Sequence, residues 1–370
     1  MQEIKKRRIV IASVLKPVND TRMFEKLGIS LSRVAEVHVA GYPAPTVTTE
    51  GIVFHPSKTF SRLSLHRLIQ PWKVYHLFRM LRPTDIIVTT HELLFPAVAC
   101  KLFFGSNVYY DLQENYWRNI MFTKTFPGFL RPFLAGYVRM KERLVHRFIH
   151  TYLVAEKGYL KEMPFIRRKS VVLENRYKES GVAVTPHGPR GPEKTILFSG
   201  TLSRSTGVFS AVTLARKLFA LDPRIRLTIV GFCPRRDEYR DLIAAISGCS
   251  FITLHGGDAL IAHTEIVRHI RESDIGLIAY EITPATENRL PTKVFEYLAN
   301  GLTVVTTPHP PWLDFIRQYQ EPVIFDPTEP DAQQVLAQIQ RSHRAQGYPR
   351  TGLLWSDVEP TLLALFRADG

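Results

Sequence analysis

The sequence lacks the features that mark membrane-spanning, disulfide-rich and disordered proteins. Nowhere in its 370 residues does an apolar run approach the roughly 18 residues of a membrane-spanning helix. Its three cysteines, Cys100, Cys233 and Cys249, are scattered without metal-like spacing, which favours free thiols in a reducing cytoplasm. Apolar residues make up 45% and charged residues 22% of the chain, as in an ordinary folded protein with room for two domains.

A convincing signal peptide is also missing. The N-terminal stretch "MQEIKKRRIVIASVL" places basic residues before an apolar run, as a signal peptide does. The apolar part is short and rich in β-branched residues, and no small-residue cleavage site follows it. We therefore interpret it as a first buried strand.

Acidic residues are scarce in one half of the chain, whose net charge is +14. Up to Arg176 there are 28 Lys and Arg residues against 13 Asp and Glu residues. From Tyr177 onward there are 20 Lys and Arg residues against 21 Asp and Glu residues. All the excess positive charge thus lies in the first half. This asymmetry indicates an anionic partner for that half alone, either a membrane surface or a nucleic acid.

A polar segment with three prolines and three glycines, "RYKESGVAVTPHGPRGPEK", divides the chain. This composition is typical of a linker between domains. We therefore expect an N-terminal domain over residues 1–175, a linker over 176–193 and a C-terminal domain over 194–345. Residues 346–370 are expected to contain a last helix.

Both halves alternate short apolar segments with helical patterns. Strands that are apolar on both faces and alternate with helices of about ten residues are typical of a parallel doubly wound sheet. We expect an α/β protein with two Rossmann-like domains facing a cleft, and ligands at the carboxyl ends of the strands. The expected strands are 8–14, 36–42, 85–90, 107–112, 150–155 and 170–175 in the first half, and 195–200, 226–232, 251–257, 274–280, 302–307 and 322–326 in the second.

The loop "TLSRSTG" follows the strand 195–200 and opens a helix. Gly200 and Gly207 permit tight turns, and the N-terminus of the helix offers N–H groups to a phosphate. Arg204 would add a bidentate phosphate contact. An ordinary strand–helix turn with an exposed arginine explains these residues equally well, because the loop has neither a complete G-x-G-x-x-G pattern nor a Walker lysine.

The stretch "NRLPTKVFEYLANGLTVVTT" is more specific. Pro291 suits the first turn of a helix, from which the N–H groups of Thr292 and Lys293 would point towards a phosphate. Glu296 lies one turn further along, within reach of ribose hydroxyls, and Gly301 ends the helix. The alternative is an amphipathic helix with a solvated Lys–Glu pair.

This pattern resembles the nucleotide-sugar site of GT-B glycosyltransferases, particularly those of glycosyltransferase family 4. The resemblance covers most of the chain and implies that the last helix crosses back to the first domain. The family's paired glutamates fall here on Asn288 and Glu296. The second glutamate, which typically binds the ribose in the family, is retained as Glu296. The first, which lies near the donor sugar, is replaced by Asn288.

The resemblance also implies which groups bind the diphosphate. The family's arginine and lysine of the phosphate loop fall on Thr201 and Thr206, which leaves Arg204 and Lys293 as the cations. No D-x-D pair occurs in the sequence, so we expect no metal and a diphosphate neutralised by cations and helix N-termini. The implied nucleotide-binding residues are Gly200, Thr201, Arg204, Asn288, Thr292, Lys293 and Glu296.

The resemblance is weaker in the first half. The segment "VNDTRMFEKLGISLS" is similar to the family's first loop, in which an Asp-x-Arg pair precedes a helix. Asp20 and Arg22 would then line the cleft near the acceptor. An aspartate that caps the helix beside a surface arginine is an equal alternative.

A second segment of the first half, "YYDLQENYWRN", is similar to a strand end at which related enzymes carry an aspartate followed by a histidine. Gln113 takes the histidine's place. Asp111 or Glu114 would serve as base or orient an acceptor hydroxyl, although a capping or loop-stabilising role is at least as reasonable for either one. His91 and Glu92 follow another expected strand and have a weaker claim to the same role.

Two basic amphipathic stretches, residues 60–83 and 126–150, interleave large apolar side chains with Arg and Lys. They are compatible with interfacial helices on anionic lipid, and equally with domain helices that have a basic solvent face. A nucleic-acid partner is not expected, because neither stacking platforms nor a known binding module is visible.

Together these features predict a metal-independent glycosyltransferase of the hexosyltransferase type. It would move a sugar from a UDP-, GDP- or dTDP-linked donor to a glycan or lipid-linked acceptor, in the biosynthesis of cell-surface polysaccharide or glycoconjugate. We expect it in the cytoplasm, peripherally on the inner face of the membrane. The alternatives are a non-hydrolysing nucleotide-sugar epimerase and a non-catalytic basic binding protein on the same scaffold.

Overall fold

In the computed structural model the chain forms two compact units, Met1–Lys178 with Trp355–Gly370, and Glu179–Leu354. Most of the expected linker, residues 180–192, lies outside the described residues. None of the described helices is long and apolar enough to cross a bilayer. The structure describes residues 7–46, 48–58, 60, 64–123, 125–179, 193–284, 286–342 and 350–367.

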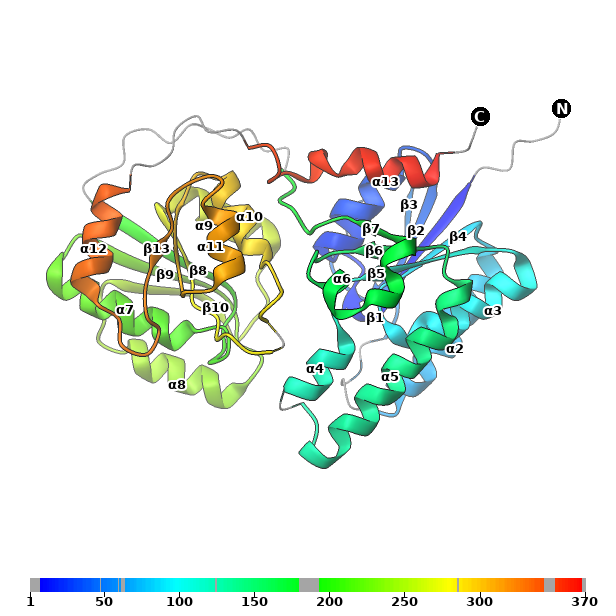
Figure 1. Ribbon diagram of the computed structural model, residues 1–370, viewed down its shortest axis with the longest axis horizontal. Helices are drawn as coiled ribbons and strands as arrows, with labels where there is room; N and C mark the ends of the chain where they lie inside the picture. The colour runs from blue at the N-terminus through cyan, green and yellow to red at the C-terminus, as the bar shows by residue number, and fades with distance from the viewer. Residues whose placement is uncertain are drawn as a thin grey trace. The chain divides into compact units, whose positions relative to one another are not determined.

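The N-terminal unit is built on a seven-stranded parallel sheet in the order β3-β2-β1-β4-β5-β6-β7 (Figure 1). The order reverses direction between β1 and β4, as in a doubly wound fold. Its strands are β1 (Arg8–Pro17), β2 (Glu36–Tyr42), β3 (Ile52–Pro56), β4 (Asp85–Val88), β5 (Asn107–Leu112), β6 (Thr151–Val154) and β7 (Ser170–Val172).

Helices bury both faces of this sheet. Residues of α2 (His66–Leu81), α3 (Leu94–Phe104) and α5 (Arg131–Val145) pack in one core, and residues of η1 (Thr21–Gly28) and α13 (Glu359–Phe366) pack in the other. The C-terminal segment is fixed to this unit by hydrogen bonds at Ser30, whose hydroxyl lies 3.0 Å from the indole nitrogen of Trp355 and 2.6 Å from Glu359. The remaining elements are α1 (Ile29–Leu31), η2 (His91–Leu93), α4 (Tyr116–Phe122), η3 (Gly128–Leu130), η4 (His146–Phe148), α6 (Tyr159–Glu162), η5 (Pro164–Lys169) and η6 (Trp355–Asp357).

The C-terminal unit repeats the scheme with a six-stranded parallel sheet in the order β10-β9-β8-β11-β12-β13. Its direction reverses between β8 and β11. The strands are β8 (Lys194–Thr201), β9 (Ile225–Phe232), β10 (Ile252–Gly257), β11 (Ile275–Ile278), β12 (Thr303–Thr306) and β13 (Val323–Ile324). The helices are α7 (Val208–Leu221), α8 (Arg236–Ile246), α9 (His263–Glu272), α10 (Thr292–Ala299), α11 (Pro310–Ile316) and α12 (Ala332–Arg341).

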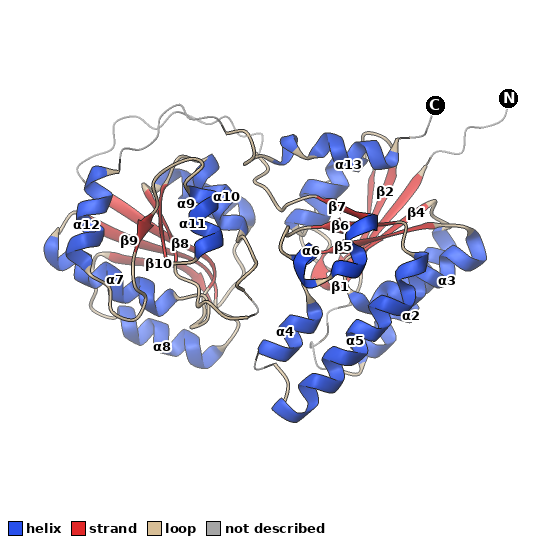
Figure 2. Ribbon diagram, viewed as in Figure 1, coloured by secondary structure: helices blue, strands red, loops and turns tan. Residues whose placement is uncertain are grey.

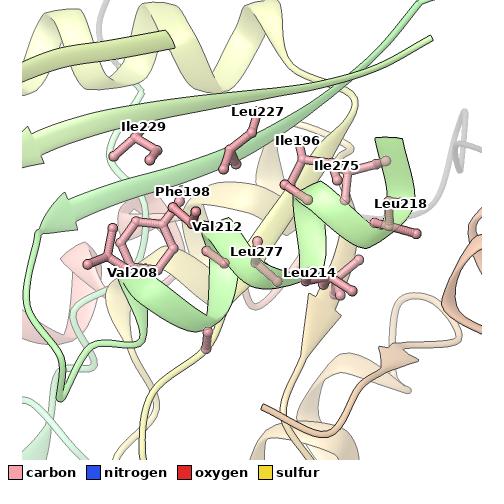
Figure 3. Close-up of a cluster of buried hydrophobic side chains, with 14 of the residues drawn as sticks. Ile196, Phe198, Val208, Val212, Leu214, Leu218, Leu227, Ile229, Ile275 and Leu277 are labelled. Carbon is pink, nitrogen blue, oxygen red and sulfur yellow. The ribbon is translucent and has the colours of Figure 1, made fainter. Parts of the chain in front are cut away.

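The core of the C-terminal unit forms where α7 lies across β8, β9 and β11. Figure 3 shows apolar side chains of α7, such as Val212 and Leu218, directed at Ile196, Phe198 and Leu277 of the strands. On the other face α9 and α10 pack against the same sheet. Figure 2 shows the parallel strands of each unit with helices around them, and the prediction of two doubly wound parallel sheets is confirmed.

Candidate functional site

The carboxyl end of β8 in the C-terminal unit brings a glycine against a lysine. Gly200 has a φ of +96°, a conformation that favours glycine. A β-carbon at this position would lie 3.0 Å from Cε and 3.3 Å from Nζ of Lys293. The ammonium group therefore lies directly over the glycine, beside the point where the strand order reverses.

Lys293 is held in place by aromatic rings. Its side chain belongs to α10, only 8% of the residue is exposed, and Nζ lies 4.8 Å from the ring centre of Phe198 and 5.1 Å from that of Tyr280. Among the described residues no carboxylate or other hydrogen-bond acceptor contacts this ammonium group. A buried cation without a counter-ion, at the place where doubly wound folds bind ligands, is suited to receive an anion.

The start of α10 adds to this positive region. Pro291 is the N-cap residue of the helix, and its side chain makes no capping hydrogen bond. The N-terminus of a helix carries a partial positive charge, and Thr292 and Lys293 are its first residues. Backbone and side chain thus direct positive charge to one end of α10.

Glu296 lies one turn further into α10 and is 7% exposed. Its Oε1 is 3.1 Å from Nε2 of His263, the first residue of α9. The Lys–Glu pair is therefore not solvated, in contrast to the alternative considered from the sequence. His263 was missed there, because nothing in its local pattern shows that α9 begins beside α10.

A row of glycines at the carboxyl ends of three neighbouring strands was also missed. Gly200, Gly231 and Gly256 lie side by side in β8, β9 and β10. A β-carbon on Gly231 would lie 1.7 Å from the carbonyl oxygen of Gly200, so no larger residue fits without movement of the backbone. Lys293 lies over the first glycine of this row, Gly200, and the side chain of Ile261 lies over the last, Gly256.

Arg204 points elsewhere. Its guanidinium lies 2.5 Å from the carboxylate of Asp241 and 4.4 Å from the ring centre of Phe209, and more than half of its side chain is exposed. Its N–H donates to Glu238. This is the exposed-arginine arrangement expected as the alternative, and among the described residues Arg204 contacts Asp241, Phe209 and Glu238 rather than Lys293.

The other expected nucleotide contacts are more peripheral. Thr201 is exposed, and its carbonyl accepts a hydrogen bond of 2.8 Å from the hydroxyl of Thr206. Asn288 is half-buried in the loop before α10, with Nδ2 at 3.4 Å from a carboxylate oxygen of Glu287. The structure therefore places Lys293 directly over Gly200, whereas the hydrogen bonds described here for Thr201 and Asn288 are local.

In the N-terminal unit, Asp111 lies at the end of β5 in a fully buried ion pair. Arg22 donates to Oδ1 from Nη2 at 2.7 Å, and Gln113 donates to Oδ2 at 2.6 Å. Arg22 also donates to the carbonyl of Leu173. Both oxygens of Asp111 are occupied, so the carboxylate joins η1 to the sheet rather than presenting an open base.

Asp20 and Glu114 have local partners. Asp20 accepts hydrogen bonds of 3.0 Å from the N–H groups of Arg22 and Met23 and so caps η1. Glu114 is half-buried and accepts a hydrogen bond of 2.8 Å from Asn119. The structure thus gives Asp20 the capping role weighed from the sequence, and Glu114 the loop-stabilising one.

His91 and Glu92, at the end of β4, belong to a buried cluster of charges. Nδ1 of His91 lies 2.8 Å from Nζ of Lys141, and Glu92 pairs with Arg67. Burial lowers the pKa of His91 to about 4 and that of Lys141 to about 8. A neutral imidazole therefore accepts a hydrogen bond from a buried ammonium group.

Comparison with known proteins links these observations to a family. Residues 183–342 match the family model described as glycosyl transferases group 1, and no curated protein matches the chain. Solved structures similar in fold include one described as trehalose-6-phosphate from E. coli bound with UDP-2-fluoro glucose. It is 12% identical over 96% of this chain and 95% of that chain, with a TM-score of 0.62.

Two further structures have the same fold. Sucrose-phosphate synthase from Thermosynechococcus elongatus is 13% identical over 98% of this chain and 95% of its own, with a TM-score of 0.62. Anabaena HepE, in complex with UDP and glucose, is 13% identical over 97% and 95%, with a TM-score of 0.59. The fold is that of GT-B proteins, in agreement with the expectation from the sequence.

Proposed function

We propose that this chain is a nucleotide-sugar-dependent glycosyltransferase. It has the GT-B fold, and its residues 183–342 match the glycosyl transferases group 1 model. The reaction would transfer a hexosyl group from a UDP-sugar to a glycan or lipid-linked acceptor. One observation carries the proposal: the buried ammonium group of Lys293, which lies over Gly200 without a counter-ion among the described residues.

The chemistry of the transfer explains why such a group is useful. When the bond between the sugar and the diphosphate breaks, negative charge grows on the departing phosphate. Lys293 and the N-terminus of α10 would stabilise that charge. Glu296 would accept hydrogen bonds from the ribose hydroxyls, with His263 beside it.

The choice of uridine among the possible bases is supported by similar structures. Two of them were solved with UDP or a UDP-sugar bound. Their low identity shows only a shared fold, so the base remains part of the proposal.

The proposed acceptor and location are supported by the surface of the N-terminal unit. α3 packs against both α2 and α5. Trp72, Phe103 and Phe133, one on each of these helices, are 67%, 73% and 76% exposed. Lys73 and Arg143 are exposed between such apolar side chains. A surface that mixes large apolar and basic side chains is suited to anionic lipid, which would place the enzyme on the cytoplasmic face of a membrane and its product in cell-surface polysaccharide or glycoconjugate.

A panel of UDP-, GDP- and dTDP-sugars in a thermal-shift assay tests the proposal. We expect UDP-sugars to raise the melting temperature, because ligand that binds only the folded state stabilises it. Glu296→Ala should weaken UDP binding about 10- to 100-fold, as expected for the loss of hydrogen bonds to a charged group.

Glu265→Ala is the matched control, because Glu265 is half exposed on the surface of α9. No shift with any sugar nucleotide would reject the proposal, and an unchanged affinity of Glu296→Ala would remove that residue from the site. Formation of an altered nucleotide sugar without any acceptor would identify an epimerase instead.

A further inference from the structure

A cavity lies within the N-terminal unit, towards the carboxyl ends of β1, β2 and β3, where residues of α2 also line it. Its volume is about 270 Å³. We call it the α2 pocket. Its polar lining includes Ser13, His55, Ser57, Lys58, Gln70 and Lys73, and none of the described residues that line it is acidic.

Two neutral donors of the α2 pocket have spare hydrogen-bonding capacity. Gln70 is only 6% exposed, and its amide has no hydrogen-bond partner among the described residues. Ser13 is 1% exposed, and its oxygen accepts bonds of 3.2 Å from the N–H groups of Leu15 and Lys16. The Ser13 hydroxyl proton is therefore available to a ligand. The Gln70 amide lines the pocket, so its two hydrogens can be donated to a ligand there.

Two cations flank these donors. Lys58 and Lys73 line the pocket, and neither ammonium group forms an ion pair with any described residue. Ammonium and amide groups around a concave site, with no carboxylate between them, match the oxygens of a phosphate. The cavity is larger than one phosphate needs, so it also has room for the group to which the phosphate is esterified.

His55 adds an acceptor to this set. Its Nε2 lies 2.9 Å from Nδ1 of His38, whose own Nε2 lies 3.3 Å from the carboxylate of Glu36. This contact uses one nitrogen of each ring and leaves Nδ1 of His55 for another partner. Burial lowers the pKa of both histidines, so both rings are neutral near pH 7. A neutral Nδ1 accepts a hydrogen bond from a hydroxyl, which a polyol phosphate would offer.

We propose that the α2 pocket binds a phosphate ester of a hydroxylated acceptor, with Lys58 and Lys73 on the phosphate oxygens and Ser13 and Gln70 as neutral donors. The inference rests on the proposed transferase function, because it identifies the pocket as part of the acceptor site. The phosphate can belong to a soluble polyol phosphate or to a lipid head group. The second source has an additional argument, since Leu68, Ile69 and Trp72 of the same helix are exposed beside Lys73.

Titration calorimetry with glycerol 3-phosphate, and co-sedimentation with phosphatidylcholine vesicles with and without phosphatidic acid, test the inference on the full chain. We expect saturable binding by the wild type. Lys73→Gln should raise the dissociation constant about tenfold, and Gln70→Leu alone should raise it more. Lys161→Gln removes the same charge from an exposed site outside the pocket and should bind like the wild type. Binding to both probes, or to vesicles alone, supports the inference and separates the soluble source from the lipid source.

Equal loss in Lys73→Gln and Lys161→Gln would show unspecific attraction to positive charge and would overturn the inference. So would the absence of binding to either probe. UDP binding is measured on the same variants and should not change. A protein that binds UDP but neither phosphate ester refutes only the α2 pocket, whereas one that binds no sugar nucleotide refutes the proposed function.

Discussion

Replacing Lys293 by methionine separates the cost of its charge in the empty protein from its contribution to ligand binding. Methionine keeps an unbranched side chain that can pack on the rings of Phe198 and Tyr280, but it removes the ammonium group. A buried polar group without a partner costs about 1–3 kcal/mol. Attraction between the ammonium group and the two rings offsets about 0.5–2 kcal/mol of this cost. We therefore expect Lys293→Met to stabilise the unliganded protein by about 1 kcal/mol, or roughly 2–4 °C in melting temperature.

The same substitution should weaken UDP binding. A hydrogen bond to a charged group contributes about 1.5–3 kcal/mol, so the dissociation constant should rise about 10- to 100-fold. Thermal unfolding without ligand and titration calorimetry with UDP measure the two effects. Lys194→Met is the control, because Lys194 is exposed at the opposite end of β8. A lower melting temperature with unchanged UDP affinity would refute the reasoning and make Lys293 a structural residue.

Three further predictions concern residues that hold the fold. Asp111→Asn should lower the free energy of unfolding by about 3–5 kcal/mol in urea denaturation, because it leaves buried Arg22 without its counter-ion; normal stability with lost turnover would instead favour a catalytic carboxylate. The free energy of unfolding should fall by up to about 3 kcal/mol as the pH drops from 6.5 towards 4, because unfolding lets buried His91 take up a proton that the folded state excludes. His91→Gln should make the free energy of unfolding less dependent on pH in this range, and an unchanged dependence would contradict this. Gly231→Ala should destabilise the protein by several kcal/mol in the same assay, since its methyl group would collide with the Gly200 carbonyl; a loss below about 1 kcal/mol would show that the strand ends move apart easily.

The sequence predicted the sheets well because most strands are buried on both faces. Strands such as 36–42 and 107–112 coincide with β2 and β5. β3 is absent from the expected elements, because only Ile52 of its five residues is buried and its pattern resembles that of a loop. α12 is also absent, and its apolar residues are few and separated by glutamines.

Parts of the candidate site that lie within one segment were visible in the sequence, and parts assembled from several segments were not. Lys293 and Glu296 share one helix, so their relation could be inferred from spacing alone. His263, Lys141 and the α2 pocket depend on strand register and on helices distant in the sequence. For Arg204 the sequence left open a phosphate contact or an exposed side chain. The exposed side chain pairs with the carboxylate of Asp241 on the neighbouring α8.

The proposed function places UDP over Gly200, with its diphosphate on Lys293 and its ribose on Glu296. A crystal structure of the protein with bound UDP tests this most directly. We expect a phosphate oxygen at about 2.8 Å from Nζ of Lys293, the distance of a charge-assisted hydrogen bond, and a ribose hydroxyl on the carboxylate of Glu296. UDP bound elsewhere, with Lys293 still against Phe198 and Tyr280 and no anion beside it, would rule out this binding site.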